Sequence, residues 1–247
     1  MNYLGGPAFA VLIALAALVG ELELLRLCNA GGYRPVAVLA VPAAVSLAVL
    51  PLAQTRPQSA WIGIVVLLVV LSGARYIIPP LRHGIIPDWS LTVAGAVYIG
   101  LLLGLLGLLR EADRGAWWVV LVLVVTWAYD TGAFFAGRTW GRIPFMSHIS
   151  AKKTLEGVAG GLALSSLCGL AGIWMVHLTW WQAIAFGLLG GAVGQIGDLV
   201  ESMFKRQVGV KDSGGIMPGH GGLLDRVDSL LFTGAFGYYA ALLVHGS

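Results

Sequence analysis

Residues that could do chemistry gather between Lys211 and Ser229, in the stretch KDSGGIMPGHGGLLDRVDS. These nineteen residues contain three Asp, two cations, one His and five Gly, in a chain otherwise rich in Leu, Val, Ala and Gly. Glycines let a backbone turn tightly and approach a ligand, cations attract anionic oxygens, and carboxylates can hold a metal ion. The mixture indicates a bound polar ligand rather than a solvated loop.

A second polar group precedes this stretch in an apolar segment. Asp198, Glu201, Ser202 and Lys205 are spaced i, i+3, i+4 and i+7, which places them on one face of a helix. One interpretation is a salt-bridge cluster that helps helices to pack. We favour a metal and phosphate site, because Mg²⁺ takes oxygen ligands and commonly uses one or two carboxylates together with substrate phosphates.

Asp225 and Asp228 are three residues apart at the start of the last predicted helix, and therefore share a face. We expect them to point toward the same ligand as Asp198. The neighbouring His220 is interpreted as a donor to a phosphate oxygen or as a residue that shapes the loop, and not as a general base.

Asp130 follows a long apolar run, in WAYDTGAFFAGRTWGR. The small residues after it would let a ligand approach the backbone, and Arg138 and Arg142 would face anionic oxygens. A structural Asp at a helix end is the alternative to this functional interpretation.

The segment ISAKKTLEG carries Lys152 and Lys153 before a helix whose first turn contains Thr154 and Glu156. Taken alone, it is best explained as a basic anchor at the membrane surface with a helix start signal. The alternative is phosphate binding, because paired lysines beside a helix N-terminus favour an anion.

Glu21 and Glu23 lie in the first apolar run, where a carboxylate is costly and needs a partner or a function. Arg26 follows Glu23 by three residues. We expect these glutamates to snorkel or to pair locally.

The elements that must position these residues are membrane helices. The 247 residues are 58% hydrophobic and only 11% charged, which excludes an ordinary soluble protein. Apolar runs near the roughly 20 residues needed to cross a bilayer recur along the chain. They predict an all-α polytopic bundle of about eight membrane helices, approximately at 7–27, 35–53, 60–78, 90–109, 116–136, 157–178, 181–205 and 226–245.

Residues 1–247 are expected to form one membrane domain, with N-terminal helices over 1–110 and the chemical motifs over 111–247. We expect a first membrane helix rather than a cleaved signal peptide, and Cys28 and Cys168 to be packing residues.

Most cations fall on one side of the predicted helices, which places the two long polar loops, about 137–156 and 206–225, in the cytoplasm. Both termini would then face outward, and the basic cytoplasmic face would suit anionic headgroups and phosphates.

The segment SMFKRQVGVKDSGGIMPGHGGLLDRVDS, from Ser202 to Ser229, closely resembles the signature of phosphatidate cytidylyltransferases. It contains a Ser, then Lys-Arg, a four-residue gap, Lys-Asp, and HGG-x-x-DR-x-D. The segments DTGAFFAGRTWGR and KKTLEG resemble other parts of the family in the expected order, so that the resemblance covers roughly the C-terminal half.

The resemblance implies transfer of a cytidylyl group from CTP to phosphatidic acid with Mg²⁺, and a second cation as an option. It implies Asp198 and Asp225 as metal ligands. We expect the cell inner membrane as the location, with the site on the cytoplasmic side to which the cation distribution points. Membrane lipids are expected partners and a homodimer is an option, whereas no nucleic-acid partner is expected. The expected catalytic residues are Asp198, Lys205, Lys211, Asp225 and Asp228. The expected substrate-binding residues are Asp130, Arg138, Lys152, Lys153, Ser202, Arg206, Asp212, His220, Gly221, Gly222 and Arg226.

Two alternatives stay open. The same nucleotidyl transfer could act on another anionic lipid phosphate, such as a prenyl-ether lipid, because lipid selectivity would lie in the N-terminal helices. The other is an ion-coupled transporter in which Asp130, Asp198 and Glu201 form the path. The absence of repeated halves and the crowding of charge on one side of the membrane argue against it.

Overall fold

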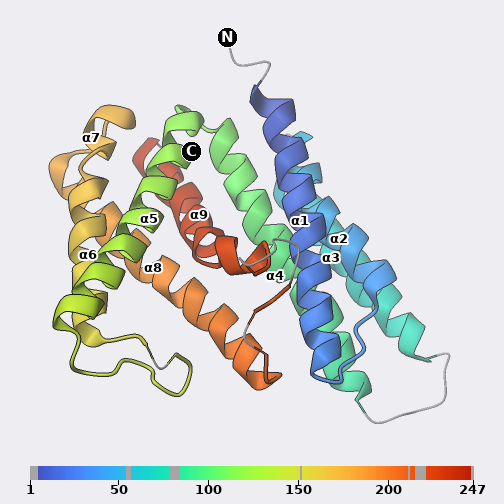
Figure 1. The fold of residues 1–247 in the computed structure, drawn as a ribbon. Coiled ribbons are helices and arrows are strands. Elements are labelled where there is room, and N and C mark those ends of the chain that lie inside the picture. The colour runs from blue at the N-terminus through green and yellow to red at the C-terminus, as the bar shows by residue number, and fades with distance from the viewer. Residues whose placement is uncertain are drawn as a thin grey trace. The chain divides into compact units, whose positions relative to one another are not determined.

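The computed structural model describes residues 5–53, 57–77, 84–150, 152–210, 212–214 and 221–245, and every regular element within them is helical. This confirms the predicted all-α class. The elements, labelled in Figure 1 where there is room, are α1 (Gly5–Ala30), α2 (Ala37–Val49), the 3-10 helix η1 (Leu50–Ala53), α3 (Pro57–Ile77), α4 (Ile85–Glu111), α5 (Gly115–Trp140), α6 (Leu155–Gly169), α7 (Gly172–Met175), α8 (Trp180–Gln207) and α9 (Leu224–His245).

Among the described residues, seven helical segments are long and apolar enough to cross a membrane, and Ala37–Ala53 forms a shorter apolar one. The prediction of about eight helices is therefore confirmed, with three differences in detail. The α-helical part of 35–53 ends at Val49, and Pro51 lies in η1 because proline removes a backbone donor. The predicted 157–178 helix is divided into α6 and α7. Finally, α5 extends to Trp140, so that Arg138 lies on this helix and not in the following loop.

The chain divides into two compact units. Unit 1 contains residues 1–108 and 204–226, and unit 2 contains residues 109–203 and 227–247. Residues 204–226, which carry much of the glycine-rich stretch, thus belong with the N-terminal helices.

In unit 1, α1 packs on α2 and α2 packs on α3. Small residues dominate the buried core of this unit, in which Ala40 and Ala44 on α2 and Ala96 on α4 are fully buried beside Leu25 and Leu68. Alanines allow helix axes to approach closely. Within a membrane the hydrophobic effect does not drive helices together, so that their association depends on tight packing of this kind.

In unit 2, α5 packs closely on α6, and glycines line the contact between them. A Cβ atom at Gly132 would lie 2.5 Å from the carbonyl oxygen of Gly160, and one at Gly161 would lie 2.8 Å from the ring of Tyr129. This small-residue packing is typical of membrane helices. It fixes α5 against α6, and with them the positions of Asp130 and of the residues before α6.

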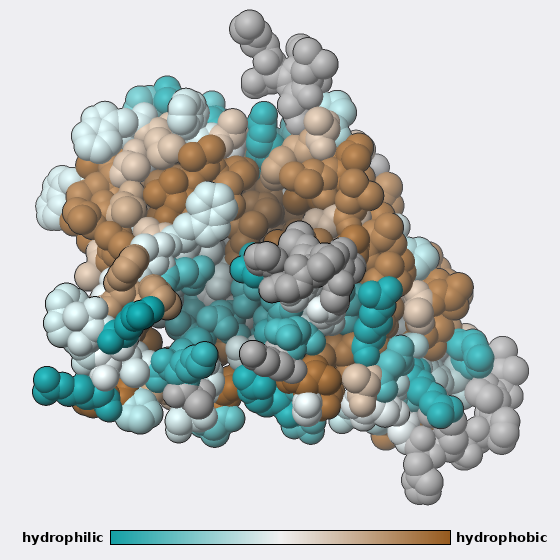
Figure 2. Space-filling view, in the orientation of Figure 1, coloured by the Kyte–Doolittle hydropathy of each residue, from teal (hydrophilic) through white to brown (hydrophobic). Residues whose placement is uncertain are grey.

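Large hydrophobic side chains on the outer surface fit a lipid surround. Figure 2 shows hydrophobic residues over wide areas of the helices. Leu67 on α3, Trp127 and Phe135 on α5 and Trp181 on α8 are more than half exposed. Exposed apolar area of this extent is unfavourable in water and favourable in a bilayer.

Candidate functional site

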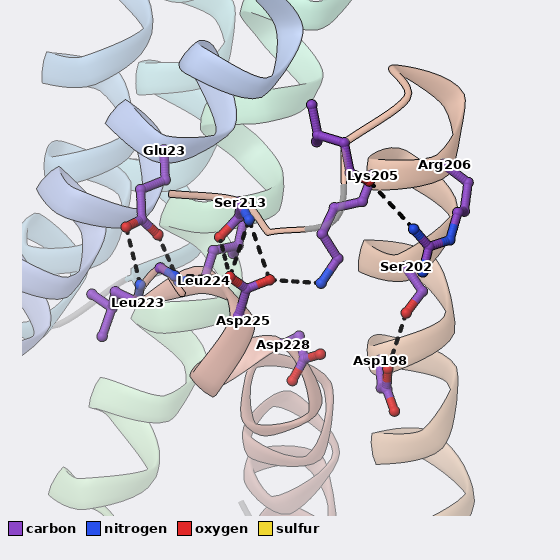
Figure 3. A network of polar contacts seen from close by, with 12 residues as sticks. Glu23, Asp198, Ser202, Lys205, Arg206, Ser213, Leu223, Leu224, Asp225 and Asp228 are labelled. Atoms are coloured by element: carbon purple, nitrogen blue, oxygen red, sulfur yellow. Dashed lines mark hydrogen bonds and ion pairs between the residues drawn. The ribbon is translucent and has the colours of Figure 1, made fainter. Parts of the chain in front are cut away.

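Asp225, at the start of α9, is the centre of a polar cluster within unit 1. Its Oδ1 accepts a 2.6 Å hydrogen bond from the Nζ of Lys205, and both side chains are nearly buried, at 13% and 12% exposed. Its Oδ2 accepts bonds from the backbone N–H and the hydroxyl of Ser213, each at 3.0 Å. Figure 3 shows Lys205 and Ser213 both pointing to the carboxylate of Asp225. We call these three residues the Asp225 cluster.

Glycine is required where the chain enters α9. Gly221 has φ of +80°, a left-handed conformation that other residues rarely adopt. The N–H of Gly222 donates to Oδ2 of Asp225 at 2.8 Å, so that a side chain three residues further on caps the helix start. The structure therefore shows Gly221 and Gly222 shaping the backbone around Asp225, next to the place where a ligand was predicted.

Glu23 on α1 also reaches the start of α9. Its two carboxylate oxygens accept the backbone N–H groups of Leu223, at 3.0 Å, and Leu224, at 2.8 Å, and the side chain is fully buried (Figure 3). The expectation that Glu23 snorkels or pairs locally is therefore wrong. Its carboxylate satisfies helix N–H groups 200 residues along the chain, which otherwise would be unsatisfied.

A second polar cluster lies within unit 2 and has Asp198 on α8 as its centre. The Oδ2 of Asp198 is 2.7 Å from the Nζ of Lys153, and Oδ1 accepts a hydrogen bond from the hydroxyl of Ser202 at 3.3 Å. Asp130 has electrostatic interactions with Asp198, Asp228 and Lys153. We call these five residues the Asp198 cluster. It contains three carboxylates and one lysine, and so carries excess negative charge.

The loop between α5 and α6 holds Lys153 in this cluster. The N–H of Phe145 donates to the carbonyl oxygen of Lys153 at 2.8 Å. The hydroxyl of Thr154 then caps α6 by accepting the N–H of Gly157 at 3.2 Å, as the helix start signal predicts. Glu156 accepts the N–H of Ile143 across the loop. Lys153 is thus fixed on both sides by backbone bonds, whereas its neighbour Lys152 is exposed.

The remaining predicted residues take separate positions. The guanidinium of Arg138 lies 6.0 Å from the centre of the Phe134 ring, and Arg206 donates to the carbonyl oxygen of Val210 at 3.4 Å. Asp212 and Arg226 are exposed, whereas Asp228 is half-buried and accepts the N–H of Ser229 at 2.6 Å. The predicted Lys211 and His220 lie outside the described residues.

Three buried polar residues of unit 1 were not predicted as site residues. Ser213 is buried and donates twice to Asp225. Glu23 is a carboxylate in an apolar run, a signal that indicates a partner or a function but does not say which groups the side chain contacts. Glu21 is also fully buried, and its carboxylate oxygens accept no hydrogen bond from the part of the chain that the structure describes.

The donors fit a hard divalent cation in type and in charge. Carboxylate and hydroxyl oxygens are the ligands that Mg²⁺ prefers, and the negative excess of the Asp198 cluster favours a cation. Within the described ranges, no three His, Cys, Asp or Glu residues are grouped closely enough to hold an ion by themselves. A metal would therefore need water or substrate oxygens as further ligands, which is the usual coordination of Mg²⁺.

These observations define a class of protein: a multi-pass helical membrane protein with lysine–carboxylate clusters suited to phosphate and metal chemistry. The comparisons with known proteins narrow the class. The model of the cytidylyltransferase family matches residues 1–244, and the chain belongs to this family of nucleotidyltransferase enzymes.

Of three individual relatives, two match nearly the whole chain and one matches about half of it. A protein from Synechocystis sp. named phosphatidate cytidylyltransferase is 34% identical over 98% of this chain and 90% of its own. One of the same name from Staphylococcus aureus is 33% identical over 90% of this chain and 86% of its own. A third, from Helicobacter pylori, is 47% identical over 53% of this chain and 48% of its own. The resemblance seen in the C-terminal half therefore extends over nearly the whole chain.

Proposed function

We propose that this protein transfers the cytidylyl group of CTP to phosphatidic acid, which forms CDP-diacylglycerol and releases pyrophosphate. The observation that carries the proposal is the similarity to phosphatidate cytidylyltransferases along nearly the whole chain. The two lysine–carboxylate clusters support it, because they supply the charges that a phosphate reaction needs.

In this reaction, an oxygen of the lipid phosphate attacks the α-phosphorus of CTP while the bond to the β-phosphate oxygen breaks and pyrophosphate leaves. The attacking phosphate is already ionised at neutral pH, so that no strong base is required. The protein would mainly align the reactants and neutralise developing charge. This requirement agrees with a site composed of cations, carboxylates and hydroxyls.

The phosphate-binding roles go to residues that carry positive charge or a hydroxyl. In unit 1, Lys205 and Arg206 would hold phosphate oxygens, with Lys211 beside them in the sequence. In unit 2, Ser202 would do so, assisted by Lys152 and Lys153. Because Lys153 and Lys205 are already paired with carboxylates, a phosphate would bind to preplaced ammonium groups that need little reordering.

Asp198 and Asp225 are the proposed Mg²⁺ ligands, with Asp212 and Asp228 as additional candidates for a second cation. A bound Mg²⁺ would supply neutralisation of the triphosphate charge. The carboxylate of Asp198 is 32% exposed and so accessible to such an ion. Asp225 is more enclosed, and its bond to Lys205 would have to rearrange for direct coordination.

We also propose that the site faces the cytoplasm from the cell inner membrane. The positive-inside rule supports this orientation, because basic residues gather there: Lys152 and Lys153 in the loop before α6, and Arg206 in the last turn of α8. CTP is soluble in water and phosphatidic acid stays in the bilayer, so that a site at the cytoplasmic surface meets both.

The test is pyrophosphate release by the detergent-purified protein given CTP, phosphatidic acid and Mg²⁺, with each component omitted in turn. Release is expected only when all three are present. The variants Asp225→Asn and Asp198→Asn should remain folded and membrane-inserted but be nearly inactive, since the amide cannot replace the charge of a metal ligand. Full activity in either variant would remove that residue from the metal site.

The same assay, together with an uptake measurement on protein reconstituted in vesicles, decides between the alternatives. Release with a prenyl-ether lipid phosphate and not with phosphatidic acid would keep the reaction and change the lipid. Substrate uptake into vesicles without any pyrophosphate release would indicate a transporter instead.

A further inference from the structure

Glu23 stands out because it is a fully buried carboxylate whose bonds all go to the beginning of another helix. Its oxygens accept the N–H groups of Leu223 and Leu224, which immediately precede Asp225. The first N–H groups of a helix have no partner within it, and leaving them unsatisfied in an apolar surround is costly. A carboxylate there also interacts favourably with the positive end of the helix dipole.

The chain on both sides of residues 215–220 packs against the same carboxylate. A Cβ atom at Gly214 would lie 2.6 Å from Oε1 of Glu23, and one at Gly222 would lie 2.5 Å from Oε2. Neither position has room for a side chain unless Glu23 moves. The Glu23 carboxylate therefore sets where the chain runs just before α9.

The same backbone supports Asp225. The N–H of Gly222 and the buried Ser213, which adjoins Gly214, both donate to Oδ2 of Asp225. Any shift of the backbone around Glu23 would therefore shift the groups that orient Asp225. We infer that Glu23 is a positioning residue, which holds the start of α9 and thereby the carboxylate of Asp225; its effect on catalysis rests on the function proposed above.

The main variant is Glu23→Gln, and Glu21→Gln is its matched control. Both residues are fully buried on α1, two positions apart, and the exchange keeps side-chain size in each. In Glu23→Gln, an amide NH₂ replaces one acceptor oxygen and faces a backbone donor. Glu21 accepts no hydrogen bond from any described residue, so the control should resemble the unmodified protein.

The first readout is hydrogen exchange in a peptide covering residues 221–230, which requires no catalytic activity. We expect Glu23→Gln to speed exchange at Leu223 and Leu224 by roughly tenfold to a hundredfold, with the thermal midpoint little changed. Exchange that is the same in both variants would overturn the inference.

The second readout is steady-state kinetics on equal amounts of folded protein. We expect kcat to fall by roughly tenfold to a hundredfold in Glu23→Gln with KM for CTP little changed, because a misplaced Asp225 weakens stabilisation of the transition state. Faster exchange together with unaltered kcat would also overturn the positioning role. If Glu23→Gln does not fold, Gly214→Ala disturbs the same contact from the opposite side and should give the same two changes.

The experiment separates this inference from the proposed function. If the unmodified protein releases no pyrophosphate, the proposed function fails, and hydrogen exchange still decides whether Glu23 holds the start of α9. If the unmodified protein is active and Glu23→Gln matches it in both readouts, only the inference fails.

Discussion

At the residue scale, the sequence gives no reason to distinguish the two adjacent lysines before α6, whereas the structure shows that they differ in burial and in partners. Lys153 is half-buried, is 2.7 Å from a carboxylate oxygen of Asp198 and has its backbone fixed by Phe145. Lys152 is exposed. An ammonium group that is already ordered beside the site loses less entropy when it binds phosphate than a mobile one does.

We therefore predict that Lys153→Ala lowers the rate of pyrophosphate release by at least about tenfold, whereas Lys152→Ala lowers it by only about twofold. The reason is that Lys153→Ala removes a held cation and leaves Asp198 without its ion-pair partner. The measurement is the steady-state rate for each variant at matched protein amounts. Equal losses in the two variants would mean that the ion pair with Asp198 has no special importance.

At the element scale, the packing of α5 on α6 positions the Asp198 cluster within unit 2. Asp130 lies on α5, and Lys153 directly precedes the cap of α6. Close contact between these helices depends on glycine, because backbone atoms of one helix occupy the space that a side chain on the other would need. Gly132 is the clearest case.

We predict that Gly132→Ala destabilises the protein by about 1–3 kcal/mol, since the added methyl group would overlap the Gly160 carbonyl and force the helices apart. The control is Gly63→Ala on α3, where a Cβ would meet nothing within 4 Å. Thermal unfolding in detergent should show a lower midpoint for Gly132→Ala and an equal or higher one for Gly63→Ala, because alanine is the better helix former. A midpoint for Gly132→Ala no lower than that of the control would argue against tight packing here.

At the scale of the whole molecule, the chain is a multi-pass membrane protein, and its orientation determines which of its loops face the cytoplasm. The loop over 141–154 carries exposed Arg142, His148 and Lys152, whereas Ala112–Arg114 connects α4 and α5 at the other end of α5. Because α5 is long enough to cross the bilayer, these two loops should lie on opposite sides.

We predict that His148→Cys is labelled by a membrane-impermeant thiol reagent only in inverted vesicles, and Asp113→Cys only in intact cells. Both variants would be made in a chain with Cys28 and Cys168 replaced, since these cysteines are free. The opposite labelling pattern would reverse the orientation and remove the support for a cytoplasmic site. Dimerisation, which the family resemblance implies, stays a prediction at this scale.

Much of the architecture could be predicted because it depends on neighbouring residues. The length of the apolar runs determined the membrane helices, and the helical period placed Asp198 and Ser202 four residues apart on one face, where they do form a hydrogen bond. The signature from Ser202 to Ser229 indicated the family, which the comparison over residues 1–244 confirmed.

Only the tertiary structure could decide which distant groups meet. Lys153 pairs with Asp198 across 45 positions, and Glu23 caps the start of α9 across 200. The apolar sequence around Glu23 indicates that its carboxylate needs a hydrogen-bonding partner. It does not indicate which one, because several backbone donors would satisfy that need equally. Which donors Glu23 contacts follows from how α1 packs within unit 1. The tertiary fold, and not spacing along the sequence, brings this carboxylate to the start of α9.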